Sequence, residues 1–382
     1  MTPRITQSGS IHLHSLSVVG FVAENTPAEQ KYALVAIGDA ITSDHPRFYQ
    51  YMKSINALIT EHAERAGIHV QLDRVSAFVL VVHADDSADL YLQDFPMQME
   101  ILAKRDFAAG EIVYHSGVAD VRRVRLPGIS LAESDGVIVC FKVGWKFGLF
   151  FDLGKDRKLD VEGMEKKLGA LYRGLSFEEA YAALGDPELF AQLVSAGWFP
   201  FVEIVGGDFD ALLNAHRQSF NVDGEEKVLL AKFDAKRIDE MARRWWAHPA
   251  LKDRRKILEP ALEAFKRGDS VSCIKIILTE MEGIIRDARI AELGTGASIK
   301  DLLKYAVERG AKKTGDESSL FFPKEFLQYL SDCTYAHFDP NAPKESTASR
   351  HSVGHGGATA DAYSPERALQ AILTLDQLVF YL

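Results

Sequence analysis

The spacing of apolar residues changes once along this chain, and that change constrains the fold more than any other feature. Before Asp160, apolar residues alternate with polar ones or form short β-rich runs, as they do in strands. After Asp160, they recur every three or four positions, as on the buried face of a helix. The sequence therefore predicts an α+β fold, in which a mixed α/β domain precedes an all-α helical bundle.

The N-terminal part predicts several strands and one helix. Strand-like runs start at Ile11 and cover residues 75–83, 111–114 and 136–153. Apolar residues between Phe48 and Ile59 instead recur at helical spacing and stop before a glycine, which is typical of a helix end. These elements define a domain whose role the sequence does not specify beyond sensing, partner binding or substrate selection.

Helices are predicted throughout the rest of the chain. They cover residues 161–172, 257–265, 274–285, 299–307, 322–330 and 364–379, the last with one apolar stripe. A loop with two prolines is expected at residues 335–346. The diglycine Gly206–Gly207 and the polar stretch 221–226 are the weakest helix formers. We therefore expect a domain at 1–205, a junction at 206–235 and a helical domain at 236–382.

Composition limits the environment and the partners of the protein. The chain has 382 residues and a formal net charge of -10, which argues against indiscriminate coating of nucleic acid. Its three cysteines are far apart among apolar residues, which predicts buried thiols in a reducing compartment. The N-terminus lacks an apolar signal core, and no run approaches the roughly 20 apolar residues of a membrane span. We expect a cytoplasmic protein with no membrane partner.

The densest chemistry lies near the C-terminal end, in Arg350, His351 and His355, just before Gly356–Gly357. An arginine and two histidines can bind phosphate and move protons near neutral pH. If the segment is helical, the two histidines share a face, whereas Arg350 and His355 diverge by roughly 140°. A site that uses both of these residues needs the helix to end near His355 or a second subunit to contribute.

This motif resembles the Asn-Arg-His-x-x-x-His-Gly version found in bacterial proteins of the HEPN superfamily (higher eukaryotes and prokaryotes nucleotide-binding domains). Ser349 stands where that version often has Asn, and residues 282–286 resemble its upstream helix. The similarity covers about residues 236–382. It implies a helical-bundle domain and a metal-independent endoribonuclease that acts as a homodimer, with the motifs of both subunits lining one cleft.

The resemblance assigns roles to individual residues. Arg350 would hold the scissile phosphate, and His355 would take a proton from the ribose 2′-OH or return one to the 5′-oxygen. His351 would orient the phosphate or share the acid–base work. The residues expected to contact the substrate are Ser349, Glu282 and Arg286.

The same resemblance sets the expected partners and cofactors. RNA is the expected substrate, no cofactor or metal is expected, and an antitoxin or regulatory protein is a possible partner. By family analogy the protein would act as a toxin or in phage defence. The alternative is a non-catalytic HEPN module that binds a nucleotide or a partner protein.

Two other interpretations of the motif stay open. His351 and His355 have the i, i+4 spacing of a zinc pair, with His337, Asp339 and Asp361 near in sequence as further ligands. Alternatively, Arg350 and the histidines only cap a helix and bond to loop carbonyls.

Overall fold

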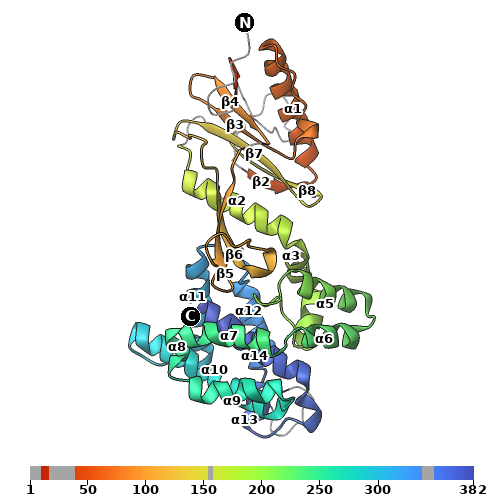
Figure 1. Ribbon diagram of the computed structural model, residues 1–382, viewed down its shortest axis with the longest axis vertical. Helices are drawn as coiled ribbons and strands as arrows, with labels where there is room; N and C mark the ends of the chain where they lie inside the picture. Colours follow the sequence, from red (N-terminus) through yellow and green to blue (C-terminus); the bar gives the residue numbers. More distant parts are fainter. Residues whose placement is uncertain (1–9, 17–38, 94, 154–157, 338–347) are drawn as a thin grey trace, which may run out of the picture. The chain divides into compact units, whose positions relative to one another are not determined.

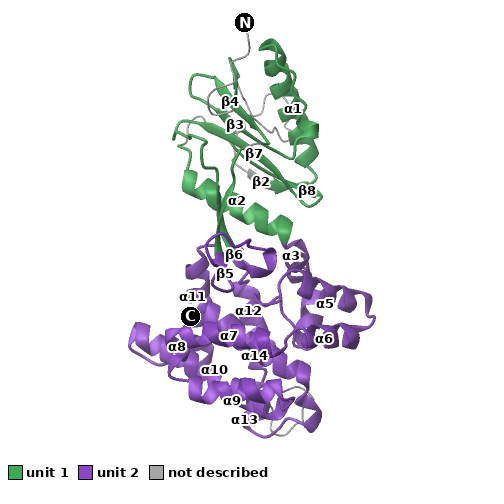
Figure 2. Ribbon diagram, in the orientation of Figure 1, with its two compact units in different colours: residues 1–101, 121–176 green, residues 102–120, 177–382 purple. Residues whose placement is uncertain are grey.

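The computed structural model describes residues 10–16, 39–93, 95–153, 158–337 and 348–382 (Figure 1). The chain forms two compact units (Figure 2). Unit 1 consists of residues 1–101 and 121–176, and unit 2 consists of residues 102–120 and 177–382. The predicted junction at 206–235 instead contains two helices inside unit 2, α5 (Gly207–Gln218) and α6 (Val222–Ala231).

Unit 1 is built on a six-stranded sheet in the order β1-β4-β3-β7-β8-β2, and every neighbouring pair is antiparallel. The strands are β1 (Ile11–Leu13), β2 (Asp39–Thr42), β3 (Ala77–Val82), β4 (Ala88–Leu92), β7 (Gly136–Val143) and β8 (Lys146–Asp152). The strands predicted at 75–83 and 136–153 are confirmed, the second as the β7–β8 hairpin. Its turn includes Gly144 at φ +59°, a conformation that glycine adopts without strain.

Each face of this sheet is covered by one helix. Alternate side chains of β3, such as Phe78 and Leu80, pack with the buried face of α1 (Phe48–Arg65) in one hydrophobic cluster. Gly148 and Phe150 of β8 contact the other helix, α2 (Val161–Ser176), through the side chains of Leu175 and Lys167. The sheet is therefore buried on both faces, which accounts for the continuous apolar runs in its central strands.

A two-stranded ribbon, β5 (Gln98–Ala103) and β6 (Val118–Arg125), connects the two units in the chain. The intervening residues belong to unit 2. The strand predicted at 111–114 is wrong, because these residues form no strand: Glu111 closes a turn on Ala108, and Tyr114 precedes a short 3-10 turn at His115–Gly117. Ile112 and Tyr114 have high β propensity, yet their side chains are largely exposed and have no neighbouring strand to pack on.

Apart from its share of this ribbon, unit 2 is helical in its described part, as predicted for the C-terminal region. Its remaining helices are α3 (Glu178–Gly185), α4 (Pro187–Ser195), α7 (Ala235–Ala247), α8 (Pro249–Lys252), α9 (Arg255–Lys266), α10 (Ser270–Leu293), α11 (Ile299–Thr314), α12 (Pro323–Tyr329), α13 (Arg350–Gly354) and α14 (Pro365–Tyr381). A π-helical turn, η3 (Leu330–Thr334), continues α12. The long helix α10 packs against α9, α11, α13 and α14. The α+β fold class is confirmed.

The last helix is buried far more completely than its sequence indicates. Every residue of α14 from Arg367 to Tyr381 is buried, not only one apolar stripe. Its polar groups have partners: Asp376 accepts hydrogen bonds from Arg244 at 2.7 Å and from the Trp245 indole at 2.6 Å. Such pairing lets a helix with polar residues run through a core without large desolvation losses. In the described part of the chain, no helix combines the length and apolar character that crossing a bilayer requires.

Candidate functional site

Helices α10 and α13 pack together in unit 2, and their contact places two predicted site residues side by side. Arg350 Nη2 lies 2.7 Å from Glu282 Oε2. Arg286, one turn further along α10, donates to the other carboxylate oxygen, Glu282 Oε1. One carboxylate therefore holds two guanidinium groups, and the three residues together keep an excess positive charge.

The Arg350 side chain runs along α13 toward its C-terminal end. Its Nη1 atom lies 4.0 Å from the position that a Cβ atom would take on Gly354. Its Nε atom is buried and has no hydrogen-bond partner in the described part of the chain. Because α13 ends at Gly354 and His355 is its C-terminal cap, the guanidinium reaches toward the residue just before His355. The helix therefore ends next to His355, which is one of the two arrangements expected to let Arg350 and His355 serve one site.

Ser349 begins α13 rather than lining an open surface. Its hydroxyl accepts a hydrogen bond from the Ser352 backbone N–H at 3.1 Å, and the Ser352 hydroxyl accepts one from the Ser349 backbone N–H at 2.9 Å. This reciprocal pair is a capping box. Both serines are buried, so a direct contact between Ser349 and the substrate stays a prediction. Since these serines cap the N-terminal end of α13, Arg350 is not required for that task.

The two histidines differ in their surroundings. His351 is half-buried, whereas His355 is exposed and donates its backbone N–H to the His351 carbonyl at 3.0 Å. Burial lowers the pKa of His351 below its ordinary value of 6.5, and the positive charges of Arg350 and His355 lower it further. A histidine with a lowered pKa is mostly neutral at pH 7, so His351 is available as a proton acceptor.

The buried residue Tyr335 was missed by sequence reasoning, which assigned it to a loop. It directly follows η3, and its ring centroid lies 6.3 Å from that of His351. Burial raises the pKa of Tyr335, so its hydroxyl stays protonated near neutral pH. That hydroxyl has no hydrogen-bond partner among the described residues. Tyr335 therefore adds a hydroxyl donor on a ring that lies near His351, and no local pattern in the sequence marks it.

A zinc site at this segment requires further ligands besides the two histidines. Among the residues that the structure describes, no group of three or more His, Cys, Asp or Glu side chains is arranged to hold a metal ion. Asp339, which is near the two histidines in sequence, lies outside the described residues.

The structure thus brings together Arg350, Glu282, Arg286 and His351, with His355 at the adjoining helix end. Ser349 supports this arrangement from the buried side. What the site can do chemically follows from these groups: a fixed guanidinium binds an oxyanion, and a neutral imidazole accepts a proton. No protein-family model, curated protein or solved structure matches the chain.

Proposed function

We propose that this protein is a metal-independent endoribonuclease of the HEPN type that cleaves RNA through its ribose 2′-OH. The observation that carries the proposal is the convergence of α10 and α13. It places the Arg350 guanidinium on Glu282 and directs it toward the end of α13 where His355 lies. A fixed positive charge beside two imidazoles is what this reaction requires when no metal takes part.

In the proposed reaction, the 2′-oxygen attacks the adjacent phosphorus while an imidazole removes the 2′-proton. The O2′–P bond forms, the P–O5′ bond breaks, and a second imidazole donates a proton to the departing 5′-oxygen. The products are a 2′,3′-cyclic phosphate and a free 5′-hydroxyl. Arg350 stabilises the negative charge that builds up on the non-bridging oxygens, and Arg286 adds to the positive field.

The roles of the two histidines follow from their environments. His351 has a lowered pKa and is the better proton acceptor near neutral pH. His355 is exposed at the end of α13, where an RNA strand can approach it. One histidine therefore removes the proton from the 2′-oxygen, and the other returns a proton to the 5′-oxygen. Glu282 holds Arg350 in place before the phosphate arrives.

A second candidate function has one specific observation in its favour. The Arg350 guanidinium is already in an ion pair with Glu282 at 2.7 Å, and a carboxylate competes with phosphate for the same guanidinium. Such a site suits a module that binds a nucleotide or a partner protein without cleaving RNA. This non-catalytic HEPN module is the alternative to the ribonuclease.

The proposal extends to the setting of the reaction by the same family resemblance. A toxin or phage-defence effector of this kind needs a restraint, which an antitoxin or regulatory partner would supply. Unit 1 is the natural candidate for receiving that signal, because it is a separate compact unit outside the catalytic helices. Buried, free cysteines suit a reducing, cytoplasmic compartment.

The first experiment is to incubate the purified protein with mixed RNA in EDTA. Metal-independent fragments that end in 2′,3′-cyclic phosphate support the ribonuclease. Intact RNA at high protein concentration contradicts it and favours the binding module. An Arg350→Ala sample prepared in the same way controls for contaminating ribonucleases, because a contaminant would cleave equally in both samples.

A further inference from the structure

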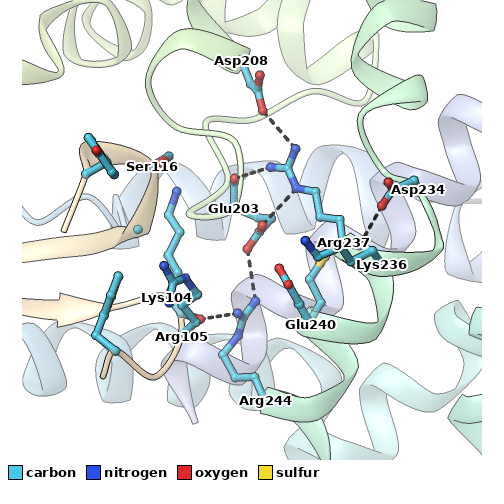
Figure 3. A pocket seen from close by; sticks show the side chains of 14 residues that line it. Lys104, Arg105, Ser116, Glu203, Asp208, Asp234, Lys236, Arg237, Glu240 and Arg244 are labelled. Atoms are coloured by element: carbon cyan, nitrogen blue, oxygen red, sulfur yellow. Dashed lines mark hydrogen bonds and ion pairs between the residues drawn. The ribbon is translucent and has the colours of Figure 1, made fainter. Parts of the chain in front are cut away.

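A polar pocket of about 410 Å³ lies within unit 2, away from the α10–α13 site. One wall is the loop after β5, with Lys104 and Ser116, and the other is the start of α7 with the segment before α5 (Figure 3). Five cationic and four carboxylate side chains line it: Lys104, Arg105, Lys236, Arg237, Arg244, Glu203, Asp208, Asp234 and Glu240. How these charges are paired decides what the pocket can bind.

Two of the arginines are already neutralised. Arg237 lies 3.2 Å from both Glu203 and Asp208. Arg244 bonds to Glu203 at 3.2 Å and to the buried Asp376 at 2.7 Å. These ion pairs hold the walls of the pocket together. The charges of Arg237 and Arg244 are therefore already balanced by carboxylates of the protein.

Unlike the exposed Lys236, Lys104 is buried. It is only 5% exposed, and among the residues that the structure describes its Nζ atom has no hydrogen-bond or ion-pair partner. Figure 3 shows its side chain extending into the space between Ser116 and Glu203. Burial lowers the pKa of Lys104 to about 8, and the carboxylates of Glu203 and Asp208, which raise this pKa, do not offset the loss of water.

The backbone around Lys104 is fixed, so its side chain is held in the pocket. The Lys104 N–H donates to the Gly117 carbonyl at 2.9 Å, which closes the β5–β6 ribbon. Its carbonyl accepts a hydrogen bond from Arg244. A buried cation on a rigid frame, without a partner, is a preorganised site for an anion that comes from outside the protein.

We infer that this pocket binds a small phosphate monoester, with the phosphate group on Lys104. Ser116 and the exposed Lys236 line the same space and supply further donors for a tetrahedral group with three terminal oxygens. Phe107 and Tyr114 also line the pocket, which is larger than a phosphate ion fills, so they contact the organic part of the ligand. The inference is independent of the proposed ribonuclease.

Isothermal titration of the full chain tests this site with four probes: AMP, ribose 5-phosphate, inorganic phosphate and succinate. At least one monoester should bind below about 1 mM, and more tightly than phosphate or succinate. The ratio between AMP and ribose 5-phosphate then distinguishes a nucleotide from a sugar phosphate. No binding by either monoester, or equal binding of inorganic phosphate or succinate, overturns the inference.

Lys104→Met removes the charge but keeps the length of the buried chain, so the fold should survive, which a thermal melt checks. Affinity for the monoester should fall at least about tenfold, because hydrogen bonds to charged groups are worth that much. Lys236→Met should lower the affinity for the monoester less than Lys104→Met does, because Lys236 is exposed. Lys300→Met, exposed on α11 outside the pocket, is the matched control. Unchanged affinity in Lys104→Met contradicts the inference.

The pH dependence gives a readout specific to Lys104. Above pH about 8 the free protein loses the Lys104 proton, so binding of the anion requires proton uptake. The affinity of the wild-type protein should then fall by up to about tenfold per pH unit. That decline should be absent in Lys104→Met. A decline of the same size in both proteins would mean that another group is responsible.

Discussion

Arg350 forms an ion pair with the Glu282 carboxylate at 2.7 Å, and this contact joins a five-residue helix to a 24-residue one. The pairing keeps the guanidinium of a short helix in a fixed place, since α10 is packed on several sides. Both members of the pair also affect the pKa of His351, because the charge of Arg350 lowers that pKa and the charge of Glu282 raises it. The two charges can be separated by mutation.

We expect the pKa of His351 to move in opposite directions in two variants. Arg350→Gln removes a positive charge and should raise the pKa of His351 toward its ordinary value of 6.5. Glu282→Gln removes the negative charge and should lower that pKa further. Nuclear magnetic resonance titration of the imidazole ring measures both shifts. Shifts of the same sign in both variants would show that Arg350 and Glu282 do not act on His351 as described.

Arg350→Ala should abolish RNA cleavage while leaving the fold intact. A cleft arginine that stabilises the reacting phosphate is worth about 10²–10³-fold in rate, whereas a partly exposed ion pair contributes only about 0–1 kcal/mol to stability. Cleavage rate and thermal melting are the two measurements. Arg243→Ala, at an exposed position on α7 with an ion pair inside its own helix, is the matched control. Equal loss of activity in both variants would contradict a specific role for Arg350.

Much of the fold follows from local pattern, and the exceptions have physical causes. The β7–β8 hairpin and helix α1 follow from apolar spacing that tertiary packing reinforces. The run at 111–114 has the composition of a strand but no partner in the described part of the chain. Complete burial of α14 depends on groups elsewhere in the chain, such as Arg244 binding Asp376, and no window along the helix reveals that.

In the candidate site, too, residues that are neighbours in the sequence were predicted, whereas contacts between distant helices were not. The arginine and histidines of α13 stand out in the sequence because they are close together. The family resemblance predicted Glu282 only as a substrate contact. Its ion pair with Arg350 was not predicted, since apolar spacing does not say which faces of two helices meet. Lys104 was missed altogether, because a lysine in sequence is ordinarily a surface residue. Its burial depends on the β5–β6 ribbon and α7 meeting around it.

Two glycines of α2 should respond oppositely to alanine. A Cβ atom on Gly169 would lie 2.8 Å from the Arg123 backbone of β6, so one of the two must shift. Gly174 has nothing within 4 Å of that position. We expect Gly169→Ala to destabilise the protein by about 1–3 kcal/mol, and Gly174→Ala to be neutral or to stabilise it by up to about 1 kcal/mol. Urea denaturation measures both; equal effects would contradict the close approach of α2 to β6.

His83 should make the stability of unit 1 depend on pH. Burial lowers the pKa of His83, but hydrogen bonds to Asp135 at 3.1 Å and to Asp89 at 3.2 Å outweigh this, so the pKa lies above 6.5 in the folded protein. Its stabilising contribution is then full below pH 6.5 and is lost as pH rises through the folded-state pKa. The difference in melting temperature between wild type and His83→Gln should therefore shrink at alkaline pH.

The control for this prediction is His69→Gln. His69 is exposed and bonds to the Gln71 amide rather than to a carboxylate. The His69→Gln variant gives the baseline for removing an exposed histidine from unit 1. If the His83→Gln difference follows that baseline between about one pH unit below and two above the ordinary histidine pKa, the two carboxylates do not hold a proton on His83.

The last prediction is that the working ribonuclease is a homodimer. Within one chain, Glu282 cancels part of the positive charge of Arg350, so a single motif holds a phosphate weakly. A two-fold axis beside Arg350–Gly357 would add a second Arg350 and His355 to the same cleft through one isologous interface. Sedimentation equilibrium at micromolar concentration should therefore show a dimer. Arg350→Ala should leave that dimer intact, because the arginine faces the cleft.

Mixing two inactive variants tests whether the dimer shares its site. Arg350→Ala and His355→Ala should each fail to cleave RNA. After subunits exchange, about half of the dimers would contain one chain of each kind, with an intact Arg350 facing an intact His355 across the two-fold axis. Partial recovery of cleavage in the mixture, but in neither variant alone, is the expected result. A monomeric wild type, or a mixture that exchanges subunits and stays inactive, rules out a shared cleft.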